Sequence, residues 1–155
     1  MTDPGIAYSQ PVFSPNGRWI AYQSTETGDN EIFVQPYPPT GAKYQLPHTL
    51  DNHHPVWSPD GSELIYVPGP TRFESAPITL EPRFGFGAAV VHPNTPFNDA
   101  PEVRRRYDVM PDGSGFVGFV QESAGASDSG GIYAVFQIYA VFNWFEELRQ
   151  RVPVD

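Results

Sequence analysis

Four consecutive polar residues, Asp51-Asn52-His53-His54, are the densest group of chemically useful side chains in the sequence. The carboxylate of Asp51 and the amide oxygen of Asn52 suit a hard cation such as Ca²⁺. An imidazole of His53 or His54 could act as a general base. The alternative interpretation is a solvated loop, in which the Asp and Asn side chains cap backbone groups.

Asp108 and Asp99 are the further carboxylates that could join this group. Asp108 falls in a short predicted strand, where alternation directs either Asp108 or its neighbours Tyr107 and Val109 inward. Asp99 belongs, with Glu102, to a loop rich in proline and asparagine, and both are weaker additions. The full set of candidate metal ligands is Asp51, Asn52, Asp99 and Asp108, with His53 or His54 activating water.

Other polar residues are expected to serve turns or to fill surface positions. Common catalytic signatures are absent from the sequence: it has no glycine-rich phosphate loop, no Gly-x-Ser-x-Gly elbow and no His-Glu-x-x-His pair. The residues interpreted as turn residues are Asp29, Asn30, Glu31, Asp60 and Asp112, and those interpreted as surface residues are His48 and His92.

The composition narrows the class of protein that can hold such a site. The 155 residues include no cysteine, so disulfides and thiolate metal sites are excluded. With 14 glycines, 18 prolines and 14% aromatic residues, the chain favours short strands joined by tight turns over a helical bundle or disorder. A net charge of −9 disfavours nucleic acid, and the longest apolar run is too short to span a bilayer.

One seven-residue motif, which we call the repeated phrase, occurs three times and divides the chain into similar units. It reads Pro11-Val-Phe-Ser-Pro-Asn-Gly17, then Pro55-Val-Trp-Ser-Pro-Asp-Gly61, then Tyr107-Asp-Val-Met-Pro-Asp-Gly113. Each copy precedes an apolar run of strand length, so each unit predicts strand, turn, strand. The turn prolines are 44 and 52 residues apart. A four-stranded propeller blade takes about 40–45 residues, so the first spacing fits one blade and the second fits a blade with an insertion of about eight residues. Outer strands are expected at Glu31–Gln35, Lys43–Leu46, Pro77–Leu80 and Gly87–Val91.

The repeats predict an all-β chain, folded as one partial β-propeller domain over residues 1–155. The blade-like units cover residues 11–54, 55–106 and 107–142, and a capping pattern at Asn143 and Glu146 predicts a C-terminal helix over 143–152. At ~44 residues per blade the chain supplies about three and a half blades, whereas propellers close with 4 to 8. The ring therefore takes further blades from other copies or from a longer protein, or else the exposed terminal blades are capped in another way. The directly repeated sequence at residues 132–143 is the expected interface strand, or else an outer strand beneath the helix.

The repeated phrase resembles the TolB-type β-propeller repeat, whose hallmark is Ser-Pro-Asp-Gly before a short apolar strand. Residues 14–34 match this pattern throughout, residues 57–67 match its first half, and the third copy departs by having Met110 in place of serine. The resemblance implies C-terminal blades of a larger bacterial protein and a periplasmic or extracytoplasmic compartment, although residues 1–5 encode no signal peptide.

Two functions follow from these expectations. The first is a non-enzymatic interaction module that binds a protein or small ligand at the channel mouth and needs no cofactor. The alternative is a calcium-dependent propeller hydrolase, in which Ca²⁺ polarises an ester or lactone carbonyl. Under the first interpretation the partners are further copies of the chain or other blades, with no nucleic acid and no membrane span.

Overall fold

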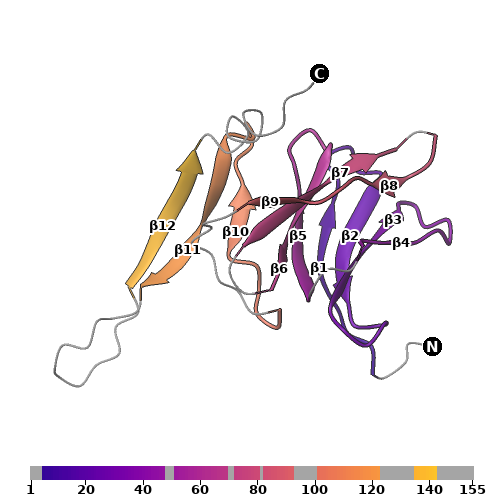
Figure 1. Cartoon of the computed structure of the whole chain (residues 1–155), viewed down its shortest axis with the longest axis horizontal. Coiled ribbons are helices and arrows are strands. Elements are labelled where there is room, and N and C mark those ends of the chain that lie inside the picture. Colours follow the sequence, from indigo (N-terminus) through magenta and orange to yellow (C-terminus); the bar gives the residue numbers. More distant parts are fainter. Residues whose placement is uncertain are drawn as a thin grey trace.

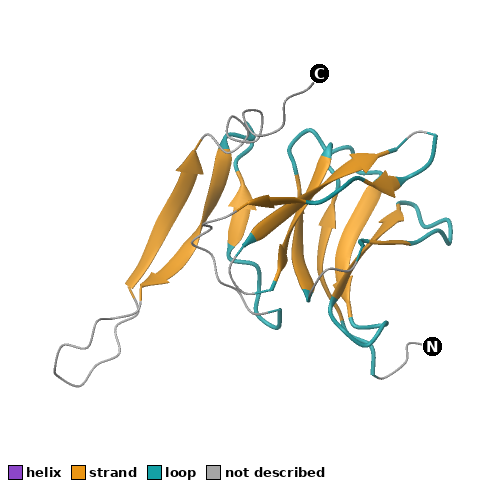
Figure 2. Ribbon diagram, in the orientation of Figure 1, coloured by secondary structure: helices purple, strands orange, loops and turns teal. Residues whose placement is uncertain are grey.

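A computed structural model describes residues 5–47, 51–69, 72–80, 82–92, 101–122 and 135–142 of the chain. Every regular element in these ranges is a β-strand, and every strand pairing is antiparallel (Figure 2). The all-β prediction is confirmed, and no helix occurs in the described ranges. The helix predicted over residues 143–152 lies outside them.

Three sheets follow one another along the chain (Figure 1). The first sheet has the order β1-β2-β3-β4, the middle sheet has the order β5-β6-β7-β8 with β9 also paired to β7, and the third sheet has the order β10-β11-β12. The strands of the first sheet are β1 (Tyr8–Phe13), β2 (Trp19–Ser24), β3 (Glu31–Pro36) and β4 (Tyr44–Gln45). Those of the middle sheet are β5 (Asn52–Trp57), β6 (Glu63–Pro68), β7 (Phe73–Thr79), β8 (Gly85–Phe86) and β9 (Val90–His92). Those of the third sheet are β10 (Tyr107–Val109), β11 (Gly115–Glu122) and β12 (Val135–Phe142).

The outer part of the middle sheet differs from the sequence expectation. The predicted strand Pro77–Leu80 begins four residues earlier, at Phe73, and its far edge is shared by β8 at one end and β9 at the other. The charged residues Arg72 and Glu74 at its start are untypical of a buried strand, so the sequence did not predict this part of β7. Glu74 is buried there because its carboxylate accepts a hydrogen bond from the Tyr66 hydroxyl (2.9 Å) and pairs with Arg72 (2.9 Å).

The repeated phrase forms the same hairpin turn in all three sheets. In the second copy, the Gly61 amide donates to the Ser58 carbonyl at 2.9 Å, and Gly61 has a φ of 74° that favours glycine. The Ser58 hydroxyl donates to Asp60 (2.7 Å) and accepts from the Glu63 amide (2.9 Å). Met110 replaces the serine in the third copy, yet the backbone bonds of that turn are kept. Backbone geometry therefore carries the turn, and the serine adds to it.

The middle sheet is covered on both faces. One core joins it to the first sheet and the other joins it to the third sheet. The first core contains Ala21, Ile32, Val34, Leu46, Trp57, Leu64, Tyr66, Ala76 and Phe84. The second core contains Val56, Ile65, Val67, Phe73, Tyr107 and Phe116. Strand β5 contacts β1 on one side and β10 on the other, so the first strands of the three sheets are neighbours in space.

No membrane-spanning helix is found in the ranges described above.

Removing the buried serine of the middle turn tests the role of its side chain. We expect Ser58→Ala to lower the free energy of unfolding by about 1–3 kcal/mol, because the Glu63 amide loses its side-chain acceptor in a buried setting. The matched control is Ser62→Ala, at an exposed hydroxyl that also donates to Asp60, with an expected loss of at most about 0.5 kcal/mol. Urea denaturation of both variants measures the difference, and equal losses would contradict this view of the turn.

Candidate functional site

The two consecutive histidines lie on β5 at a β-bulge. Pairing of β5 with β6 shifts register between His53 and Val56, and His54 has a left-handed φ of 54°. A bulge breaks the alternation of side chains, so the two neighbouring imidazoles can meet instead of pointing to opposite faces of the sheet. They are 1% and 0% exposed.

Strand β1 carries the equivalent bulge. Its register shifts between Ser9 and Val12, and Gln10, the residue before Pro11, has a φ of 53°. Gln10 and His54 occupy the same place in the repeat, and both side chains reach one acceptor. Gln10 Nε2 and His54 Nε2 each lie 2.8 Å from the Val103 carbonyl oxygen. One carbonyl therefore joins the first strands of two sheets.

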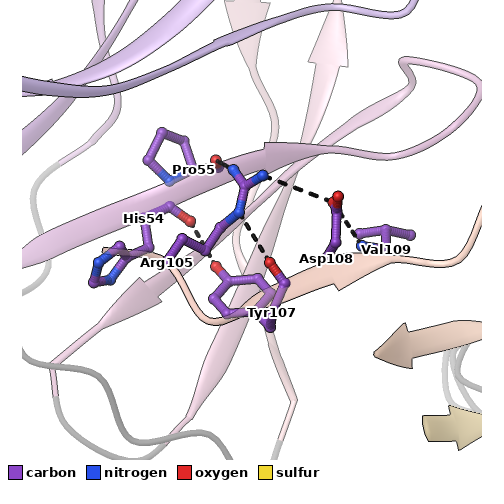
Figure 3. Close-up of polar contacts among 6 residues, drawn as sticks. All are labelled: His54, Pro55, Arg105, Tyr107, Asp108 and Val109. Carbon is purple, nitrogen blue, oxygen red and sulfur yellow. Dashed lines mark hydrogen bonds and ion pairs between the residues drawn. The ribbon is translucent and has the colours of Figure 1, made fainter. Parts of the chain in front are cut away.

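Val103 belongs to residues 101–106, which we call the connecting segment because it leads into β10. Its Pro101 carbonyl accepts a hydrogen bond from Gln23 Nε2 at 3.2 Å. At its other end, Arg105 donates to the Pro55 carbonyl at 2.8 Å and to the Tyr107 carbonyl at 3.0 Å (Figure 3). The segment is thus tied by hydrogen bonds to the first sheet, to β5 and to β10.

Tyr107 also connects β10 to the histidine strand. Its hydroxyl donates to the His54 carbonyl at 2.5 Å, and its ring is 4% exposed (Figure 3). Asp108 points away from this contact and is 62% exposed at its side chain. Its Oδ1 accepts from the Val109 amide (2.9 Å) and lies 3.8 Å from Arg105 Nη2. Of the two directions that alternation left open, Tyr107 and Val109 are the residues directed inward, toward the second core, and Asp108 is directed outward.

A single proton lies between the two facing nitrogens of the histidine pair, His53 Nδ1 and His54 Nδ1. His53 Nδ1 and His54 Nδ1 are 2.6 Å apart, so one of these nitrogens must donate and the other must accept. Because His54 Nε2 faces a carbonyl, it carries a proton, and in the neutral pair His53 Nδ1–H donates to His54 Nδ1. Burial, and then the charge on His54, lower the pKa of His53 from 6.5 to about 3.

The expected metal ligands are not brought together by this arrangement. Asp51 is half-buried just before β5, and Asn52 is fully buried with its Nδ2 at 3.5 Å from both Glu31 Oε2 and the Pro47 carbonyl. Asp108 lies exposed on β10, and Asp99 lies outside the described residues. Among the residues described, no three His, Cys, Asp or Glu side chains are grouped so that they could hold a metal ion.

A second pair of chemically suggestive residues lies elsewhere in the middle sheet. Ser75 Oγ and His92 Nε2 are 3.0 Å apart, a distance suited to a nucleophile and its base. Ser75 is 0% and His92 6% exposed, so the surface position expected for His92 is wrong. The pair is closed to substrate and joins β7 to β9. His48, the other histidine expected at the surface, lies outside the described residues.

An open cleft adjoins the shared carbonyl. It has a volume of about 510 Å³ and lies between β1 and the connecting segment. Its lining residues are Ser9, Gln10, Pro11, Glu102, Val103, Arg104 and Arg105. The sequence suggested Glu102 only as a weak additional carboxylate. The available signal was the polar residue before the repeated proline, at Gln10 and His54.

The sequence matches none of the known protein families against which it was scanned, and no similar sequence is found among curated proteins.

Titration of the histidine pair gives a test of its buried state. A lowered pKa in the folded state means that the unfolded chain binds the extra proton first. The contribution of His53 to stability is therefore complete above about pH 6.5 and is lost as the pH falls toward 3, with a slope of at most about 1.4 kcal/mol per pH unit.

We expect the His53→Gln variant to have a shallower decline of unfolding free energy between pH 6.5 and 4 than the parent chain, measured by urea denaturation at several pH values. NMR titration of the ring carbons should show His53 neutral at pH 4.5 in the folded parent. Protonation of His53 near pH 6.5, or an unchanged slope in the variant, would contradict the proposed geometry.

Proposed function

We propose that this chain contributes three consecutive blades of a TolB-like β-propeller and acts as a binding module, with its ligand site in the cleft beside the connecting segment. The propeller arrangement is supported by the equivalent hairpins in the three sheets and by the neighbouring positions of β1, β5 and β10. Loops and first strands of such blades surround the central channel, which is where propellers commonly bind ligands.

The single observation that carries the binding function is the charge of the cleft. The connecting segment supplies Arg104 and Arg105 against one carboxylate, Glu102, in a chain whose net charge is −9. Arg105 is held by backbone carbonyls, whereas Arg104 is exposed and belongs to none of the ion pairs of the described residues. An exposed guanidinium in a polar cleft suits a carboxylate. We therefore assign a peptide or small ligand that carries an acidic group.

Burial of the histidines favours binding over hydrolysis. A general base must come within hydrogen-bond distance of the substrate or of the attacking water. His53 and His54 are enclosed, their Nδ1 atoms are bonded to each other, and His54 Nε2 is bonded to the Val103 carbonyl. The bond from His54 holds the connecting segment that lines the cleft.

Acidic-peptide binding is tested with the probe acetyl-Gly-Gly-Glu-Gly-Gly-amide. We expect it to shift the amide resonances of residues 102–105 and Gln10 in NMR titration, and the same peptide with Gln in place of Glu to bind more weakly. Arg104→Ala should weaken binding about fivefold, the equivalent of about 1 kcal/mol for an exposed ion pair. The matched control Arg18→Ala removes an exposed arginine from the first hairpin turn and should leave affinity unchanged.

Equal binding of the Glu and Gln peptides, or resonance shifts confined to residues away from the cleft, would contradict this proposal.

Hydrolase activity is tested separately with p-nitrophenyl acetate and a simple lactone, each with Ca²⁺ and with chelator. We expect no turnover above the background rate in either condition, because the described residues hold no group of three His, Cys, Asp or Glu side chains that could bind a metal and because the histidines are enclosed. Calcium-dependent turnover that is lost in Asp51→Asn or His54→Gln would reverse this conclusion and favour the enzyme.

A further inference from the structure

The two faces of each sheet can be compared through the repeat. A shift of 44 residues carries the paired residues Phe13 and Ile20 of the first sheet onto Trp57 and Leu64 of the middle sheet. Trp57 and Leu64 belong to the core that the first sheet covers. Phe13 and Ile20 therefore mark a face equivalent to one that is buried in the neighbouring sheet. We call it the leading face.

The leading face of the first sheet is apolar and open. Phe13 is 52% exposed, whereas its equivalent Trp57 is 4% exposed. Tyr8 is 53% exposed, and its ring lies 6.1 Å from that of Tyr22, the equivalent of buried Tyr66. A groove of about 310 Å³ runs along this face. Its lining residues are Tyr8, Ser9, Pro11, Ile20, Tyr22 and Gln35.

The opposite face of each sheet, which we call the trailing face, covers the leading face of the next sheet. It is marked in the first sheet by the pair Val12 and Ala21, which pack into the first core. The equivalent pair in the middle sheet is Val56 and Ile65, which pack against the third sheet. In the third sheet the equivalent pair is Asp108 and Val117, at the same register.

The trailing face of the third sheet is open where its side chains are described. Val117 is 38% exposed, and Asp108 is exposed with its charge near Arg105. The described chain thus ends in a leading face on one side and a trailing face on the other. These are the two kinds of face that already pack together twice within the molecule.

We infer that a second copy of this chain docks its third sheet on the leading face of the first sheet, in a head-to-tail contact repeated twice. This inference rests on the proposed function in one respect, that the sheets are propeller blades. Propellers close with 4 to 8 blades, and two copies that each supply the three described sheets reach this range. The product is a closed six-bladed dimer with two identical heterologous interfaces.

Light scattering after size-exclusion chromatography measures the mass of the intact chain. We expect twice the 17.2 kDa chain mass at micromolar concentration, with dimerisation strengthened by salt because two chains of charge −9 repel each other. A monomer at every concentration and salt level would overturn the inference.

Substitutions on the two faces separate a head-to-tail contact from a symmetric one. Phe13→Glu and Val117→Lys, at exposed positions on opposite faces, should each give monomers. A control at a third exposed apolar position, Val91→Glu on the outer strand β9, should remain a dimer. Circular dichroism and thermal unfolding establish that each variant is folded. A monomeric Phe13→Glu variant with a dimeric Val117→Lys variant would overturn the head-to-tail contact, as would a monomeric control.

Mixing the two face variants provides the decisive measurement. A mixed pair contains one interface with both wild-type faces, and its other interface brings the introduced glutamate of one copy against the introduced lysine of the other. We expect an equimolar mixture of Phe13→Glu and Val117→Lys to recover dimers that neither variant forms alone. Absence of recovery would overturn the inference.

The peptide titration distinguishes the two proposals, because Phe13 does not line the cleft. A monomeric parent chain that binds the acidic peptide would overturn the dimer and keep the binding function. A dimeric parent chain that does not bind the acidic peptide would overturn the binding function and keep the dimer.

Discussion

Burial of the middle sheet on both faces is the interaction on which the rest of the structure depends. An isolated sheet of short strands is marginally stable in water, and apolar burial against a second layer stabilises it. Here the middle sheet supplies aromatic and aliphatic side chains to two cores at once, with Trp57 and Tyr66 in one and Phe73 in the other. The first strands of the three sheets are held side by side as a result, and this brings two equivalent bulges close enough to share a partner.

The Val103 carbonyl is the acceptor that side chains from both bulges share. Two side chains from equivalent places in the repeat, Gln10 and His54, donate to this one oxygen. Each bulge alone would leave a buried or half-buried polar group that needs a partner. Their convergence, together with the bonds of Arg105, holds the connecting segment against both strands, and Arg104 remains exposed in the cleft.

Residues with catalytic chemistry serve here as internal connections. The facing nitrogens of His53 and His54 join neighbouring residues of a bulge, and Ser75 with His92 joins β7 to β9. Both pairs are buried, so their polar atoms bond to each other and a substrate cannot reach them. The same polar atoms that could perform chemistry in an open cleft satisfy one another in a closed interior, so burial decides between the two roles.

The features that could be predicted from the sequence have local causes. The hairpin turns, the spacing of 44 and 52 residues and the all-β class depend on adjacent residues, above all on the glycine that accepts a positive φ at the end of each repeated phrase. The long-range choices required the tertiary structure. Alternation alone could not decide between Tyr107 and Asp108, because a period of two leaves the phase open until a core is present.

The β-bulges are a second reason why the directions of side chains could not be predicted from the sequence. One extra residue in β5 breaks the alternation, so the rings of His53 and His54 meet although an unbroken strand would direct them to opposite faces. Similarly, the early start of β7 depends on Tyr66 and Arg72 compensating the buried Glu74. Turns were therefore predictable because their causes lie within a few residues. The cleft and the polar pairs were not, because their partners meet only when the sheets pack.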